Sequence, residues 1–270
     1  MSTAPTTNII ECKNEFNQLK FNLQGGLLLG WTQLDTGIEV FYQGFDEKRT
    51  GLPLLFPFAD SLTKGIYKHT NQNMARHGFG RNLLWNMDKC TDNQLEVCIN
   101  SEDLSEEMRQ AYPFNFSCHI NLDISKPKTL KYRLTVKNKG NETMAIAPGL
   151  HPYFNIEHTH KHRLSVAGIP KFNAGNYNWN QELEGGLYFE NPGSVKAFLP
   201  NGNTIEVIDS SPDPENRFGQ TVIWSQNITF PDYNFVCIEQ FTKPKNGLND
   251  DPILIPEDQQ WIGEITYILK

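Results

Sequence analysis

Residues 75–85, which read ARHGFGRNLLW, combine groups that could bind an anion or move a proton. His77 lies between Arg76 and Gly78, and a second cation, Arg81, follows a further glycine. An imidazole titrates near neutral pH, and a guanidinium can hold an anion through two parallel hydrogen bonds. On its own this stretch is more typical of a surface turn with solvated charges, so its interpretation depends on the rest of the chain.

A second histidine lies in residues 149–156, which read GLHPYFNI. Pro152 biases His151 toward an extended backbone. Tyr153 and Phe154 add flat apolar surface beside the ionisable ring. Because sugar rings have apolar C–H faces, this combination suits a sugar pocket. The alternative is a buried structural histidine in a loop.

A carboxylate interrupts the apolar run FVCIEQF at residues 235–241. Alternation along a strand places Phe235, Cys237, Glu239 and Phe241 on one face. A carboxylate is costly to bury as an ion, so Glu239 should face water, be paired or have a function. Burial would raise its pKa toward the range that suits a general base.

Three further features are weaker candidates. Arg49 opens RTGLPLLFPF (49–58) and could hold an anion or be a solvated surface cation. Asp209 starts the polar loop 209–220 and could point into a pocket. The run EHTHKHR (157–163) would place three histidines on one face of a strand, where they could bind a metal. It has no cysteine nearby, and its charged neighbours suit a mobile loop, so we expect no metal site.

Alternating apolar and polar residues predict that strands position these groups. Residues 114–124 and 130–136 alternate cleanly, and SKPKT between them suits a hairpin loop. Further strands are expected within 26–34, 38–43, 204–209 and 235–241. Residues 101–112 are the best helix, with Ser101 as its cap. Many strands, 20 glycines and 16 prolines favour an all-β fold, a large antiparallel β-sandwich.

Bulk properties exclude several classes of protein. The length of 270 residues fits a single domain over 1–270, and the net charge of −7 argues against nucleic-acid binding. No apolar run is long enough to cross a bilayer, so no membrane contact is expected. The N-terminus does not resemble a signal peptide, and the five cysteines form no CxxC pair. These features favour a cytoplasmic protein with reduced thiols.

Taken in order, the motifs resemble those of the aldose 1-epimerase family, the galactose mutarotase-like proteins. RTGLPLLFPF and RHGFGRNLLW resemble the hexose-6-phosphate 1-epimerase branch, in which an HGFAR segment has alanine where Gly80 stands. The HPYF of GLHPYFNI is closer to the galactose mutarotase side. FVCIEQF resembles the strand that holds the glutamate of the family.

The resemblance implies a galactose mutarotase-like supersandwich with a sugar site on a concave sheet face, and mutarotase activity without a metal or organic cofactor. Glu239 would take the proton of the C1 hydroxyl, and His151 would protonate the ring oxygen. His77, Arg81 and Arg49 would bind the hydroxyls of the sugar or a phosphate. Asp209 corresponds to an acidic ligand of the hydroxyls but aligns poorly. Arg76 fits less well, because the branch more often has an uncharged residue there.

Several alternatives remain open. A non-catalytic carbohydrate-binding or sugar-sensing module would share the fold, because fold does not determine function. An accessory domain of a glycoside hydrolase or lyase and a structural or interaction protein are further alternatives. The presence of both His151 and Glu239 favours catalysis, because binding alone needs no acid–base pair. The partner is expected to be a small-molecule sugar or sugar phosphate, and the sequence does not decide between the two.

Overall fold

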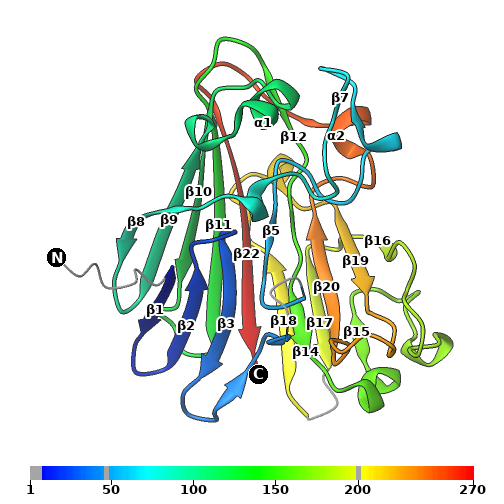
Figure 1. The fold of residues 1–270 in the computed structure, drawn as a ribbon. Helices are drawn as coiled ribbons and strands as arrows, with labels where there is room; N and C mark the ends of the chain where they lie inside the picture. Colours follow the sequence, from blue (N-terminus) through cyan, green and yellow to red (C-terminus); the bar gives the residue numbers. More distant parts are fainter. Residues whose placement is uncertain (1–7, 46–48, 199–201) are drawn as a thin grey trace.

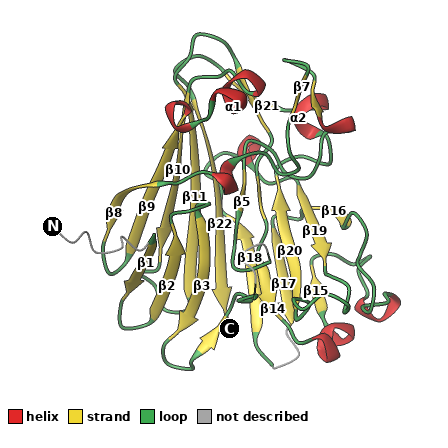
Figure 2. Ribbon diagram, in the orientation of Figure 1, coloured by secondary structure: helices red, strands yellow, loops and turns green. Residues whose placement is uncertain are grey.

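A computed structural model describes residues 8–45, 49–198 and 202–270. Its strands form antiparallel sheets that pack in layers (Figures 1 and 2), which confirms the predicted all-β antiparallel sandwich. The largest sheet has eight strands in the order β15-β17-β18-β22-β11-β10-β9-β8. These are β8 (Asn86–Cys90), β9 (Gln94–Asn100), β10 (Phe116–Asp123), β11 (Thr129–Asn138), β15 (Ser165–Ala167), β17 (Ser194–Phe198), β18 (Thr204–Asp209) and β22 (Gln260–Leu269).

A six-stranded sheet carries most of the candidate chemistry. Its path is β16-β19-β20-β13-β5, and β14 also pairs with β20. The strands are β5 (Leu54–Leu55), β13 (Gly149–Leu150), β14 (Tyr153–Asn155), β16 (Leu187–Glu190), β19 (Gln220–Trp224) and β20 (Phe235–Phe241).

The remaining strands form smaller units. A four-stranded sheet contains β1 (Ile9–Lys13), β2 (Asn17–Asn22), β3 (Leu27–Gln33) and β4 (Ile38–Glu39). Two strand pairs are β6 (Ile66–Tyr67) with β7 (Gln72–Asn73) and β12 (Met144–Ile146) with β21 (Ile253–Ile255).

Helices are short wherever the structure describes the chain. The α-helices are α1 (Glu106–Ala111) and α2 (Gly247–Asp250). The 3-10 helices are η1 (Thr63–Gly65), η2 (Gly80–Asn82), η3 (Ser101–Asp103), η4 (His158–Arg163), η5 (Ala174–Asn176) and η6 (Pro214–Asn216). Within the described ranges, none is long and apolar enough to span a bilayer.

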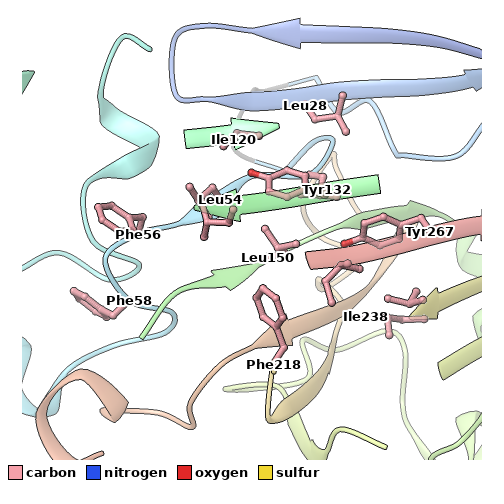
Figure 3. Packing of buried hydrophobic residues seen from close by; sticks show 14 of the residues in the cluster. Leu28, Leu54, Phe56, Phe58, Ile120, Tyr132, Leu150, Phe218, Ile238 and Tyr267 are labelled. Atoms are coloured by element: carbon pink, nitrogen blue, oxygen red, sulfur yellow. The ribbon is translucent and has the colours of Figure 1, made fainter. Parts of the chain in front are cut away.

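Apolar side chains from the eight-, six- and four-stranded sheets meet in one core (Figure 3). Leu28 of β3, Leu54 of β5 and Tyr132 of β11 belong to the same buried cluster, as do the residues labelled from β10, β13, β20 and β22. The eight-stranded sheet therefore packs its inner face against the six-stranded and four-stranded sheets. Burial of this apolar area is the main driving force that holds the layers together.

The predicted helix over 101–112 is divided in the structure. Asn100 and Asp103 form a capping box around η3, and Leu104 is extended. The helix α1 starts afterwards, where the backbone N–H of Met108 donates to Ser105 Oγ at 3.2 Å. Ser105 rather than Ser101 is the cap of the α-helix, because its extended backbone aims the hydroxyl at the first free N–H groups.

The strand expected at 38–43 is also shorter than predicted. The Glu39 carboxylate accepts hydrogen bonds from the backbone N–H groups of Trp31 and Phe41, at 2.8 and 3.2 Å. The side chain thereby replaces partners that a continued ladder would supply, and β4 ends at Glu39.

Candidate active site

A cleft with room for about 290 Å³ opens on the six-stranded sheet. It is lined by residues of β16, β19 and β20 and by the segment that carries His77. Its walls combine Arg49, Arg76 and Arg81 with Glu182 and Glu239, two histidines and the aromatic side chains of Tyr153, Tyr188, Trp224, Phe230 and Phe241. This volume is near the lower end of the range for small-molecule pockets, which suits a ligand of about monosaccharide size.

Strand register brings His151 and Glu239 together. Leu150 of β13 pairs with Gln240 of β20, and Tyr153 of β14 pairs with Cys237. The interruption between β13 and β14 therefore lies opposite Glu239. Here the Nε2 of His151 is 3.3 Å from the Oε2 of Glu239, and both residues are buried.

The two faces of β20 pack against different parts of the molecule, as the alternation predicted. Val236 and Ile238 belong to the large core, whereas Phe235 and Cys237 pack with Tyr153. Glu239 shares the face of Phe235 and Cys237, so the strand directs its carboxylate into the cleft.

Aromatic rings fix the imidazole of His151. The ring stacks on Tyr153 with centroids 4.7 Å apart, and the edge of Trp224 approaches at 5.8 Å. His77 contacts it from another side, with ring centroids also 5.8 Å apart. These contacts leave His151 little freedom to rotate away from Glu239.

Burial shifts the pKa values of the pair toward its uncharged forms. Burial lowers the pKa of His151 to about 3, and the nearby charge of Arg81 acts in the same direction. Burial also raises the pKa of Glu239 well above its usual value, although Arg76 and Arg81 act against this shift. These shifts favour a neutral imidazole beside a protonated carboxyl group, so that the pair shares one proton.

His77 is locked in one tautomer by the backbone of Asp60. The N–H of Asp60 donates to Nδ1 of His77 at 3.0 Å, and the N–H of His77 donates to the carbonyl of Asp60 at 2.7 Å. Burial lowers the pKa of His77 well below its ordinary value. The neutral ring therefore carries its proton on Nε2, where it can donate to an oxygen of a ligand.

Gly78 allows the close contact with the backbone of Phe56 that positions His77. A Cβ at this position would lie 2.3 Å from the carbonyl oxygen of Phe56, and the backbone has a φ of +69°. Only glycine fits both restrictions. His77 itself has a φ of +70°, a conformation that the two hydrogen bonds to Asp60 hold in place.

The three arginines reach the cleft from two segments. Arg49 lies with its Cζ 5.0 Å from the ring centroid of Phe230. Arg81 lies in η2, and Arg76 places its Nε 3.2 Å from Oδ1 of the buried Asp60. Tyr188 donates a hydrogen bond to the other oxygen of Asp60. Asp60 thus connects the backbone of His77, Arg76 and Tyr188.

Of the residues singled out in the sequence, the structure brings His77, Arg81, Arg49, His151 and Glu239 to one cleft, and Arg76 with them. It does not bring Asp209 there. The Asp209 carboxylate accepts backbone hydrogen bonds from Ser211 at 3.1 Å and Phe218 at 2.7 Å, so it orders the loop that follows β18.

The histidine run at 157–163 does not form the strand that the metal interpretation required. It forms η4, in which His158 contacts Asn180 and His160 contacts Glu157. A different donor set includes His151 and Glu239 of the cleft lining together with the buried Cys237, and its ligand atoms are within 4.8 Å of one another. The charges of Arg76 and Arg81 in the same cleft oppose a cation at that position.

Several residues of the site had no role in the sequence interpretation. Among them are Glu182, Tyr188 and Trp224 of the cleft lining, and Asp60, which contacts Arg76 and Tyr188 of that lining. Asp60 and Tyr188 belong to segments that carry no recognisable pattern, and they meet only in three dimensions. Trp224 donates to Glu182 at 3.2 Å, which fixes an aromatic wall beside His151. The only available signal was the excess of aromatic residues, which does not single out a position.

Comparison with protein families gives one match, to the family described as aldose 1-epimerase, over residues 8–251. No curated protein matches the sequence.

Several solved structures share the fold. The Slr1438 protein from Synechocystis sp. PCC 6803 aligns with a TM-score of 0.81 and 21% identity, over 100% of this chain and 99% of its own. A galactose mutarotase related enzyme from Lactobacillus acidophilus aligns with a TM-score of 0.78 and 20% identity, over 97% of each chain. A galactose mutarotase-like protein from Lactobacillus casei ATCC 334 aligns with a TM-score of 0.77 and 16% identity, over 97% of this chain and 100% of its own.

Proposed function

The chain belongs to the aldose 1-epimerase family, and from this premise we propose that it is a mutarotase, an isomerase that interconverts the α and β anomers of a hexose or hexose 6-phosphate. The observation that carries the proposal is the contact of 3.3 Å between His151 and Glu239 at the wall of the cleft. Anomer exchange needs one proton removed from the C1 hydroxyl and one added to the ring oxygen. A pair that holds a single proton can do both.

The proposed reaction begins with the sugar bound so that its C1 hydroxyl meets Glu239 and its ring oxygen meets His151. The proton on the pair passes to His151 across the contact, which leaves Glu239 as the base. Glu239 takes the hydroxyl proton while His151 protonates the ring oxygen, and the C1–ring oxygen bond breaks. Rotation about C1–C2 and reclosure on the other face of the aldehyde use the same groups in reverse.

His77 supports this chemistry as a neutral hydrogen-bond donor. Its Nε2–H can donate to a sugar oxygen, because Nδ1 is occupied by the N–H of Asp60. Tyr153 and Trp224 provide apolar surface for the C–H faces of the ring. None of these steps draws on a metal ion or an organic cofactor.

Three arginines in one cleft support a hexose 6-phosphate as the preferred substrate. A phosphate carries close to two negative charges and pairs with guanidinium through parallel hydrogen bonds. Arg49, Arg76 and Arg81 together provide more positive charge than the hydroxyls of a neutral sugar require. We therefore propose Arg49 and Arg81 as a phosphate clamp, with Arg76 held in place by Asp60.

The test of substrate class compares kcat/KM for glucose and glucose 6-phosphate in the parent, Arg49→Ala and Arg81→Ala. Each variant should lose a charge-assisted contact, about 10- to 100-fold in kcat/KM, for glucose 6-phosphate and far less for glucose. Arg109→Ala, on α1 outside the cleft, is the matched control. Equal losses for both sugars would contradict the clamp and favour a free hexose as substrate.

A non-catalytic sugar-binding module is the alternative function, and the aromatic walls of the cleft would serve it equally. The same assay separates the two roles. Saturable binding of either sugar without acceleration of anomer exchange by the parent protein would favour the binding module.

A further inference from the structure

We propose that Asp88, Cys98 and His119 form a binding site for a divalent cation of the zinc type on the outer face of the eight-stranded sheet. The site is separate from the cleft, because none of these residues lines it. It lies on β8, β9 and β10, the three strands at one edge of that sheet (Figure 1).

Strand register accounts for the meeting of the three side chains. Cys98 of β9 lies directly opposite His119 of β10 in the antiparallel ladder, so both side chains point to the same face. Cys98 also pairs with Asn86 of β8, two residues before Asp88. The register of β8 shifts between Met87 and Lys89, and this bulge contains Asp88. A bulge redirects a side chain, and here the carboxylate reaches both partners.

The distances fit a tetrahedral cation. Cys98 Sγ is 3.3 Å from one oxygen of Asp88, and His119 Nδ1 is 3.5 Å from the other. One ligand atom from each residue lies within 4.8 Å of the other two. Tetrahedral zinc with bonds of about 2.0–2.3 Å places its ligand atoms roughly 3.3–3.8 Å apart. Small rotations of the side chains would therefore bring all three into coordination.

The donor types indicate the class of cation. A thiolate and an imidazole favour zinc and similar transition metals over magnesium or calcium, which prefer oxygen ligands. Three protein ligands leave a fourth position for water, as in open zinc sites. On binding, the S–H bond of Cys98 breaks, a sulfur–metal bond forms and the proton passes to solvent.

Access to the site is open from one side. The side chains of Asp88 and His119 are 42% and 46% exposed, whereas Cys98 is buried beneath them. The overall negative charge of the protein favours the approach of a cation. The sulfur is thus shielded from bulk solvent, and a cation would reach it by way of the exposed side chains of Asp88 and His119.

Cobalt(II) is the probe that tests this site, because a cobalt–thiolate bond produces a near-ultraviolet charge-transfer band that other ligands do not. Titration of the full chain should produce this band with one cobalt per protein, and added zinc should displace it. Cys98→Ser should abolish the band. His119→Ala and Asp88→Asn, which alter exposed side chains, should weaken cobalt binding at least about tenfold.

The remaining cysteines provide the controls. Cys90→Ser removes an exposed thiol from the same strand as Asp88 and should leave the band unchanged. Cys237→Ser removes the thiol beside His151 and Glu239 and should also leave it unchanged. Absence of a band at a large molar excess of cobalt would overturn the proposal, as would a band that is lost in Cys237→Ser and kept in Cys98→Ser. The readout does not depend on the proposed enzyme activity.

Discussion

Glu239 and His151 form one titrating unit rather than two independent groups. Their side chains are in contact, and burial raises the pKa of the carboxyl while it lowers that of the imidazole. The folded pair therefore keeps one proton across a wide pH range. Since anomer exchange consumes no net proton, the same one-proton form serves both directions of the proposed reaction.

The dependence of rate on pH should reflect this shared proton. With glucose, a substrate without titrating groups, kcat/KM should remain level as the pH falls through 6.5, the ordinary pKa of histidine. It should decline in acid only near the lowered pKa of His151, about 3, and in alkali as the pH passes the raised pKa of Glu239. An acid limb centred near pH 6.5 would show that His151 titrates as an ordinary exposed histidine.

At the scale of elements, strands that alternate were predictable and irregular segments were not. The strand β20 spans Phe235–Phe241 as expected, because its alternation reflects two faces that pack against different clusters. The hairpin of β10 and β11 also follows the prediction. By contrast, the 3-10 helix at His158–Arg163 carries no apolar periodicity that sequence analysis could detect.

The same distinction applies to the candidate site. His77, His151 and Glu239 could be singled out because their types and neighbours are unusual in the sequence. The role of Asp60 could not, because it depends on a φ of +59° and on partners 16 and 128 residues away. Asp209 was predicted because the family often has an acidic ligand of the sugar hydroxyls between the histidine and the glutamate, but its backbone contacts direct it elsewhere.

Substitution of Gly78 should disrupt the segment that carries His77. In Gly78→Ala the new Cβ would meet the Phe56 carbonyl, so we expect a loss of about 3 kcal/mol or more in the free energy of unfolding, with a large loss of activity. Gly37→Ala is the matched control, because Gly37 has the same φ of +69° but no atom within 4 Å of its Cβ position. It should lose only about 1–2 kcal/mol. Equal losses in urea unfolding would show that the contact with Phe56 is unimportant.

At the scale of the whole molecule, the net charge and the charge of the cleft differ in sign. The chain carries a net charge of −7, yet three arginines gather around Glu239. The total charge therefore argues against a polyanionic partner such as nucleic acid but not against a small anion in the cleft. The assignment of residues 1–270 to one domain stays a prediction.

The free energy of unfolding should be greatest near pH 6.5, because the pKa shifts of His77 and of the His151–Glu239 pair lower it on opposite sides of this pH. Below pH 6.5 the unfolded chain protonates His77 but the folded protein does not, so stability falls as the pH falls. The His151–Glu239 pair does not change the free energy of unfolding between pH 4.5 and 6.5, because it holds one proton in both the folded and the unfolded state. Above pH 6.5 the unfolded chain has released that proton and the folded pair retains it, so stability falls as the pH rises.

Urea unfolding as a function of pH measures these slopes, each of about 1.4 kcal/mol per pH unit. His77→Gln should flatten the acid side below pH 6.5, and Glu239→Gln should flatten the alkaline side above pH 6.5. Glu190→Gln, an exposed carboxylate on β16, should keep both slopes. Stability that rises steadily from pH 5 to 8 in the parent protein would contradict this assignment of protons.

The central claim, acid–base catalysis by His151 and Glu239, is tested most directly by the rate of anomer exchange in Glu239→Gln and His151→Asn. Each variant keeps the approximate shape of the side chain but cannot play its part in proton transfer. With folding verified by circular dichroism and Glu190→Gln as control, each should lose at least about 100-fold in kcat on whichever hexose or hexose 6-phosphate the parent protein prefers. If both variants fold and each keeps a kcat within a few-fold of that of the parent protein, the mechanism is contradicted.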